Sequence, residues 1–120
     1  PPGTSDIAIS VVQQIPVDEF VMVTTPSKLV SMVVSKAINM AIEVKKPIVG
    51  LVENMAYIKC DECGHQINIY KSDETDNVAQ KYGLDVVAKL PLDPELANDA
   101  DEGLIENYQS GHLKELVEKL

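Results

Sequence analysis

The chain has 120 residues, enough for one compact domain, and 45% of them are hydrophobic against 24% charged, as expected of a globular rather than a disordered protein. The formal net charge of −9 disfavours nucleic acid and anionic membrane surfaces as partners, because both are negatively charged. No apolar run approaches the roughly 18–20 residues that cross a bilayer, so we expect no membrane-spanning segment.

Helical patterns alternate with β-branched apolar runs along the chain. The predicted strands are 20–25, 47–54 and 85–91. The predicted helices are 6–15, 27–44, 73–83 and a C-terminal stretch with Leu113, Leu116, Val117 and Leu120 on one face. The strands are almost continuously apolar, which is typical of parallel strands covered on both faces, and their connections are long enough for parallel crossovers. We therefore predict an α/β fold, half of a doubly wound and mainly parallel sheet, in a single domain over 1–120.

The helix over 27–44 has the clearest pattern. Thr25 is placed to cap its N-terminus, with Pro26 at the first helical position, where the missing N–H group costs nothing. Polar residues recur every four positions at Ser31, Ser35, Asn39 and Glu43. This spacing predicts one solvated stripe on a helix that is otherwise buried.

The connection between residue 54 and the helix near 75 is longer than a simple α/β protein needs. It contains "AYIKC" and "HQINIY", which can pair as a small hairpin with Cys60 and Cys63 at its tip. These are the only cysteines of the chain, spaced C-x-x-C and followed by Gly64. Two cysteines so close together do not make a disulfide framework, which favours a reducing cytosol. We predict that 55–72 is a metal-binding insertion.

A C-x-x-C pair followed by Gly is the usual half of a zinc or iron–sulfur site. The polar neighbours Lys59, Asp61 and Glu62 argue against two cysteines buried in a core. A thioredoxin-type redox pair is disfavoured because it opens a long helix near a βαβ unit. A [4Fe–4S] cluster takes four thiolates, which a two-fold symmetric dimer supplies from two such pairs. The alternative is a zinc site completed within one chain by His65 or His112.

Three other segments carry groups that bind ligands in α/β proteins. "PPGTSD" (1–6) presents hydroxyl and N–H groups just before a helix, which suits a phosphate or a metal-bound water. Glu53 and Asn54 end the second strand, where an Asn amide suits the edge of a purine. Pro91, in "LPLDPE" (90–95), ends the third strand at the same rim. For each segment taken alone, a capping or strand-end turn is the simpler explanation.

Taken in order, "PPGTSD", "VTTP", "GLVENMAYIKCDECG" and "LPLDPE" resemble the C-terminal half of the Mrp/ApbC-type iron–sulfur cluster carrier ATPases, a deviant-Walker P-loop family that includes the ParA and MinD proteins. The resemblance covers nearly the whole chain. It implies a cytoplasmic homodimer that binds ATP with Mg²⁺. It also implies that a labile [4Fe–4S] cluster is held between two C-x-x-C pairs and passed to apo iron–sulfur proteins.

The resemblance assigns roles by position. It implies a nucleotide-sensing switch near the γ-phosphate, an adenine side of the ATP site, and a pair of cluster ligands. The matching residues are Pro2, Gly3, Thr4 and Asp6 in the switch, Asn54, Pro91 and Leu92 on the adenine side, and Cys60 and Cys63 as cluster ligands.

The chain departs from the family pattern in several places. It has no G-x-x-x-x-G-K-[ST] motif, and the Walker B aspartate of the family would precede Pro1. We therefore expect a fragment that does not hydrolyse ATP alone and that exposes a sheet edge where the P-loop strand is missing. Val33 stands where the family usually has Asp, and 70–77 stands where it usually has a Gly-rich stretch.

Two alternatives to the cluster carrier are kept. One is a non-catalytic α/β interaction domain with a structural zinc knuckle at Cys60 and Cys63, since thiolate sites also take zinc in isolated proteins. The other is a metal-independent ATPase of the ParA/MinD type. The metal that is bound distinguishes the carrier from the zinc knuckle, and the effect of replacing the cysteines tests the metal-independent ATPase.

Overall fold

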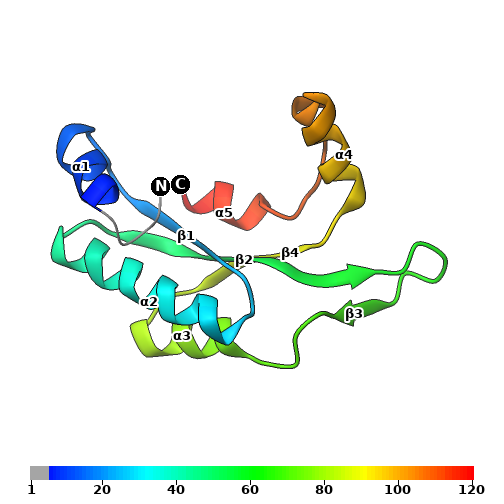
Figure 1. Ribbon diagram of the computed structural model, residues 1–120, viewed down its shortest axis with the longest axis horizontal. Coiled ribbons are helices and arrows are strands. Elements are labelled where there is room, and N and C mark those ends of the chain that lie inside the picture. The colour runs from blue at the N-terminus through cyan, green and yellow to red at the C-terminus, as the bar shows by residue number, and fades with distance from the viewer. Residues whose placement is uncertain (1–5) are drawn as a thin grey trace.

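The computed structural model describes residues 6–120, and helices and strands alternate along them (Figure 1). The helices are α1 (Asp6–Gln14), α2 (Lys28–Glu43), α3 (Glu74–Tyr82), α4 (Pro94–Glu102) and α5 (Lys114–Lys119), with a 3₁₀ turn η1 (Ile105–Asn107) before α5. The strands are β1 (Phe20–Thr24), β2 (Ile48–Lys59), β3 (Gln66–Asn68) and β4 (Val86–Pro91). The predicted α/β fold is confirmed.

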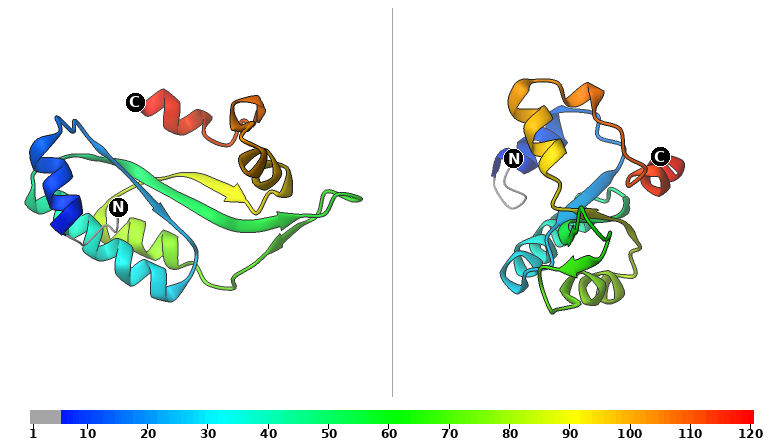
Figure 2. Two further views of the ribbon diagram at one scale, coloured as in Figure 1. Left: turned by 45° about the horizontal axis from the view of Figure 1, so that its top comes forward. Right: turned by 90° about the vertical axis from the view of Figure 1, so that its right-hand side faces the viewer.

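The sheet is built around β2. Both β1 and β4 pair with it in parallel, and β3 pairs with its far end in antiparallel orientation. The helices α2 and α3 cover one face of the sheet, while α4 and α5 lie on the other side (Figure 2). A mainly parallel sheet with helices on both sides is the arrangement expected of the apolar strands and their helical crossovers.

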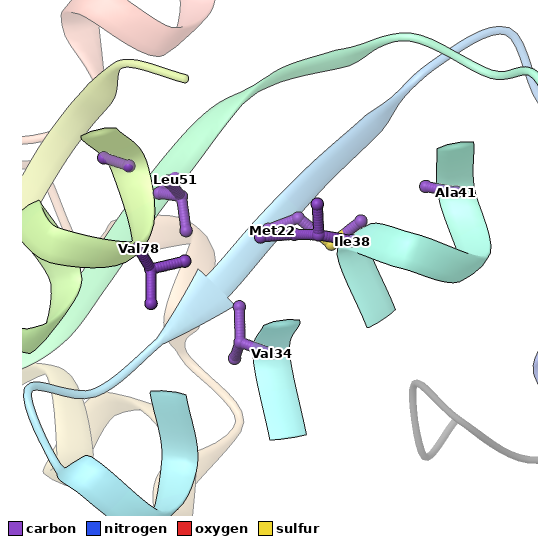
Figure 3. Packing of buried hydrophobic residues seen from close by; sticks show 7 residues of the cluster. Met22, Val34, Ile38, Ala41, Leu51 and Val78 are labelled. Carbon is purple, nitrogen blue, oxygen red and sulfur yellow. The ribbon is translucent and has the colours of Figure 1, made fainter. Parts of the chain in front are cut away.

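The core lies on both faces of β2. On the α2 and α3 face, Leu51 and Ile38 have no exposed surface, and they pack with Met22, Val34 and Val78 (Figure 3). On the opposite face a smaller cluster contains Val52, Val87 and Ala88, with Leu116 of α5 packed against it. Successive residues of a strand point to opposite faces, so burial on both sides requires an unbroken apolar run.

The start of α2 differs from the prediction. The helix begins at Lys28 with Ser27 as its N-cap residue, so Thr25 does not cap it and Pro26 is not its first residue. The reason is a tight turn in which the Ser27 N–H donates to the Thr25 carbonyl at 2.7 Å. The Ser27 carbonyl then accepts the first helical hydrogen bond, from the Ser31 N–H at 2.9 Å.

The predicted solvated stripe on α2 is wrong at Ser31, which is buried. Its hydroxyl donates to the Lys28 carbonyl at 2.8 Å, so the backbone satisfies it inside the helix. The buried face of α2 is formed by Ser31, Val34, Ile38 and Ala41. The apolar residues Leu29 and Met32 are exposed instead.

Within the part of the chain that the structure describes, β1 and β4 each pair with β2 alone, so each has a free edge. Beside the edge of β1, the elements α1, β1 and α2 line an apolar groove of about 490 Å³, which includes Ala8, Val33 and Met40. Val23 of β1 is 60% exposed. The edge of β1 is therefore a place where a further strand can pair.

Within residues 6–120 there is no helix with the length and apolar character needed to span a membrane. The longest helix, α2, has 16 residues. It packs its buried face on β1 and β2 rather than presenting an apolar surface all round.

Asp93 anchors the C-terminal part of the chain. One of its carboxylate oxygens accepts the N–H groups of Glu95 and Leu96 at 2.9 and 3.4 Å, which caps α4, and the other accepts the Tyr108 hydroxyl at 2.6 Å. The Tyr108 hydrogen bond, followed by the two backbone N–H groups, lowers the pKa of Asp93 against the opposing effect of burial. Asp93 thus ties the turn after β4 to the segment that leads to α5.

We expect Tyr108→Phe to lower the free energy of unfolding by about 1 kcal/mol at neutral pH, because the carboxylate loses a hydrogen bond. A lowered folded-state pKa stabilises the protein above the unfolded-state pKa, and that stabilisation is lost as the pH falls through the folded-state pKa. The difference from wild type should therefore shrink in acid, as measured by chemical denaturation across pH. Tyr70→Phe, at an exposed tyrosine, is the control. A difference that does not change with pH would contradict this account.

Gly50 is needed where β2 passes β4. A Cβ atom at this position would lie 2.6 Å from Val87 Cγ1 and 2.9 Å from the Asp85 carbonyl oxygen. The Asp85 carbonyl accepts the Leu51 N–H at 2.8 Å, so the backbone there has little freedom to move.

We expect Gly50→Ala to lower the free energy of unfolding by about 2–3 kcal/mol through overpacking of the core. Gly111→Ala is the matched control, since a Cβ at Gly111 meets nothing within 4 Å. Urea denaturation of the two variants tests this expectation. Equal stability of the two variants would show that β2 and β4 can separate without cost.

Candidate functional site

Cys60 and Cys63 lie at the tip of the hairpin formed by β2 and β3. The paired residues are Tyr57 with Asn68, Ile58 with Ile67 and Lys59 with Gln66. The hairpin projects from the end of the sheet, away from α1 and α2 (Figures 1 and 2). The predicted hairpin is present, although its second strand is shorter than the "HQINIY" segment and its first strand is a direct continuation of β2.

Backbone hydrogen bonds shape the cysteine turn. The Cys60 N–H donates to the His65 carbonyl at 2.9 Å, and the Gly64 N–H donates back to the Cys60 carbonyl at 2.8 Å. Gly64 has a φ of +71°, a left-handed conformation that Gly adopts without the steric cost of a Cβ. The turn therefore holds the two cysteines close together at the surface.

The turn also favours the thiolate form of Cys60. The N–H group of Cys63, then its thiol, then the N–H group of Glu62 hydrogen-bond to the Cys60 sulfur and lower the pKa of this thiol. Burial and the carboxylate of Asp61 oppose the effect. Because the thiolate is the form that binds metals, these N–H groups prepare Cys60 as a ligand.

The hairpin by itself supplies two ligands. Cys60 is half-buried and Cys63 is exposed, and neither forms a disulfide. Among residues 6–120, no group of three or more His, Cys, Asp or Glu side chains is arranged to hold a metal ion. His65 contributes its carbonyl to the turn, whereas His112 lines a cleft beside Pro91 and Tyr108. In the described part of the chain, Cys60 and Cys63 therefore stand without a third ligating side chain beside them, and neither histidine is placed to complete a zinc site with them.

The residues predicted on the adenine side lie at the carboxyl ends of two neighbouring parallel strands, near the base of this hairpin. The Asn54 side-chain oxygen accepts the Met55 N–H at 2.9 Å. Pro91 pairs with Tyr57 across the sheet, and the Leu92 N–H donates to the Tyr57 carbonyl at 2.8 Å. The ends of β4 and of the core part of β2 thus meet where the hairpin begins, as expected for parallel strands whose carboxyl ends share one edge.

The predicted switch loop lies mostly outside the described residues. Pro2, Gly3 and Thr4 belong to the segment that the structure does not describe. Asp6 is the first residue of α1 and is exposed.

An ionic cluster beneath the hairpin was not predicted. Glu53 is 6% exposed, and Lys89 reaches it at 3.9 Å while donating to Asp76 of α3 at 2.9 Å. Burial opposes the charge on Lys89, but its hydrogen bond to Asp76 and the nearby carboxylates together raise its pKa. The cluster borders a polar cavity of about 230 Å³ that Tyr57 and Asn68 of the hairpin also line. In the sequence, the charged residue Lys89 inside the apolar run "VVAKLP" was the signal from which this cluster could have been predicted.

The chain is similar to known proteins over most or all of its length. A family model described as ParA, the NUBPL iron-transfer P-loop NTPases, matches residues 1–120. A protein of Clostridium perfringens named iron–sulfur cluster carrier protein is 40% identical over 108 residues, which are 90% of this chain and 38% of that protein. A protein of the same name from Haemophilus influenzae is 39% identical over 126 residues, covering all of this chain and 34% of that protein.

A solved structure is similar as well. It is a nucleotide-binding protein of Archaeoglobus fulgidus in complex with ADP, with a TM-score of 0.81 and 36% identity, and the match covers 92% of this chain and 45% of that one. The chain thus spans about a third of the length of the two named carriers. By its match to the family model over its whole length, the chain belongs to the NUBPL-type iron-transfer P-loop NTPases of the ParA group.

Proposed function

We propose that this chain is the C-terminal part of an ATP-binding iron–sulfur cluster carrier. In this proposal a labile [4Fe–4S] cluster is the cargo, held between two subunits and transferred to apo iron–sulfur proteins. The observation that carries the proposal is the turn at Cys60 and Cys63, which presents two free cysteines close together at the end of a sheet that is similar to that of an ADP-bound protein.

The proposal requires a homodimer. A [4Fe–4S] cluster takes four thiolates, and one hairpin has two. A second copy related by two-fold symmetry brings an identical pair to the same place, because a two-fold interface joins the same surface of both subunits. The exposed tip of the hairpin gives such a copy access to both sulfurs.

The nucleotide part of the proposal uses two groups of residues, one for the adenine base and one for the phosphates. Asn54, Pro91 and Leu92 meet the adenine base, and 1–6 contains the switch near the γ-phosphate and Mg²⁺. The phosphates themselves need a P-loop, and the sequence has none. In our proposal 1–120 is therefore part of a larger α/β domain, with 55–72 as its metal-binding insertion, and this chain alone does not hydrolyse ATP.

In this proposal the rest of that domain adds a strand at the free edge of β1. The unpaired backbone groups of β1 and the apolar groove beside it, between α1, β1 and α2, support this placement. The working compartment in this proposal is the cytoplasm, where thiols stay reduced. The partners are a second copy and apo iron–sulfur proteins, with no nucleic acid and no membrane surface, given the net charge of −9.

The full-length protein, reconstituted with iron and sulfide without oxygen, tests the proposal. We expect about four iron atoms per dimer and a brown absorbance, because one cluster bridges two subunits. Cys60→Ser and Cys63→Ser should each reduce the bound iron to near zero while Mg·ATP still binds, since the hairpin tip lies apart from the nucleotide residues. Asp61→Asn, an exposed change in the same turn, is the control and should keep the cluster.

Other outcomes would point elsewhere. A colourless dimer that takes up zinc but no iron under these conditions would support a structural zinc knuckle. Full activity of both cysteine variants in the intact protein, with no metal bound to the wild type, would support a metal-independent ATPase. Tight metal binding by a strict monomer would overturn the shared site.

A further inference from the structure

A bulge in β2 separates the sheet from the cysteine hairpin. In the pairing of β2 with β4, Glu53 lies opposite Lys89, and the next pair is Tyr57 with Pro91. Between these pairs β2 advances four residues while β4 advances two, so residues 54–56 are out of step with the neighbouring strand. A bulge bends its strand and increases the local twist. Its conformation therefore sets the angle at which the hairpin leaves the sheet.

The bulge is strained at Met55. This residue has a φ of 55°, in the left-handed region that costs free energy for any residue with a Cβ. Its side chain is 43% exposed, so core packing does not force the conformation. Beside this strained residue, the Met55 N–H donates to the side-chain oxygen of Asn54 at 2.9 Å, which fixes the peptide between Asn54 and Met55.

A second hydrogen bond connects the turn after β4 to the strand that leads to the cysteines. The Leu92 N–H, in the turn after β4, donates to the Tyr57 carbonyl at 2.8 Å. Tyr57 is the first hairpin residue of β2 and lies three positions before Cys60. A movement of the turn at Leu92 or of the bulge is therefore passed directly to the strand that carries Cys60.

We propose that the bulge at Asn54 and Met55 is a nucleotide-responsive hinge, with both as positioning residues that orient the thiolate pair. This inference rests on the proposed function, in which Asn54 meets the adenine base. An Asn that pairs with an adenine edge uses its oxygen and its nitrogen together, so the base fixes the plane of the amide. Nucleotide and the Met55 N–H then compete for the orientation of one side chain.

This competition predicts one conformation of the hairpin without nucleotide and another with it. Without nucleotide, Asn54 holds Met55 in the left-handed conformation and the hairpin in the orientation seen here. With nucleotide, Asn54 turns to the base and Met55 relaxes to a common backbone conformation, so the hairpin changes its angle to the sheet. Because such coupling is reciprocal, a cluster held between two hairpins changes nucleotide affinity by the same factor.

Amide hydrogen exchange of the hairpin in the full-length protein tests the hinge, without and with Mg·ADP or Mg·ATP. In the wild type we expect nucleotide to change the exchange rates of residues 57–60 and 66–69 by about fivefold or more, the lower end of typical coupling factors. Met55→Gly removes the left-handed penalty, so it should abolish this response. Met55→Ala is the matched control, because it keeps the Cβ and should keep the response.

A second pair of variants tests the same bond without nucleotide. Asn54→Asp keeps an oxygen acceptor for the Met55 N–H, whereas Asn54→Ala removes it. We expect hairpin amides to exchange faster in Asn54→Ala than in Asn54→Asp. This comparison decides the question even where Met55→Gly does not fold.

The outcomes separate this inference from the proposed function. If the wild type binds Mg·ADP but its hairpin does not respond, or if Met55→Gly and Met55→Ala respond alike, the hinge is overturned and the carrier proposal stands. Equal exchange in Asn54→Asp and Asn54→Ala overturns the hinge as well. If the wild type binds no Mg·ADP, the nucleotide part of the carrier proposal and the hinge fall together.

Discussion

The continuity of β2 is the constraint on which the rest of this structure depends. The same strand carries Leu51, which has no exposed surface, and ends at Lys59, directly before Cys60 at the hairpin tip. Because side chains alternate across a strand, a slip of one residue in the pairing of β2 would turn Leu51 to the opposite face. The packing of the core therefore fixes the position of the strand from which the cysteine hairpin extends.

The ionic cluster at Glu53 reinforces this constraint just before the bulge. A buried carboxylate is costly unless a positive charge compensates it, and Lys89 of β4 provides that charge while also bonding to Asp76 of α3. Three elements are thereby fixed relative to one another at the last regular residue pair of β2 and β4. Beyond this pair the hairpin is held by β3 and by the Leu92 hydrogen bond. The bulge thus separates the rigid parallel sheet from a hairpin that is held by few contacts.

The alternation of strands and helices was predictable from sequence because it depends on apolar periodicity. The runs around Leu51 and Val87 are apolar on both faces, and this signals a buried parallel strand wherever the run occurs. The C-x-x-C hairpin was also predictable, since its two cysteines, Gly64 and flanking β-branched residues are local signals. The strands of the core and the tip of the hairpin were therefore expected before the structure was seen.

The features that sequence reasoning missed depend on contacts between distant segments. Ser31 was expected in water because it shares a period with Asn39, yet the helix turns Ser31 toward the core and its own backbone satisfies the hydroxyl. The left-handed Met55 carries no Gly or Asn signal, because its conformation arises from a mismatch with β4 and from the Asn54 side chain. Roles at Asn54, Pro91 and Leu92 came from resemblance, and the structure adds that Pro91 and Leu92 contact Tyr57, three residues after Asn54 in β2.

The weak attachment of the hairpin agrees with a site that must release what it holds. Stability is not uniform within a protein, and segments with few buried contacts open first. The hairpin pairs over three residues of β3, and Ile58 and Ile67 beside the cysteines are largely exposed. A structural zinc site is closed by four protein ligands, whereas this hairpin offers two cysteines. In the proposed carrier half of the ligands belong to another copy, so any movement that separates the two hairpins weakens the shared site. In this proposal a small change in the angle between the hairpin and the sheet is then sufficient to release the cluster.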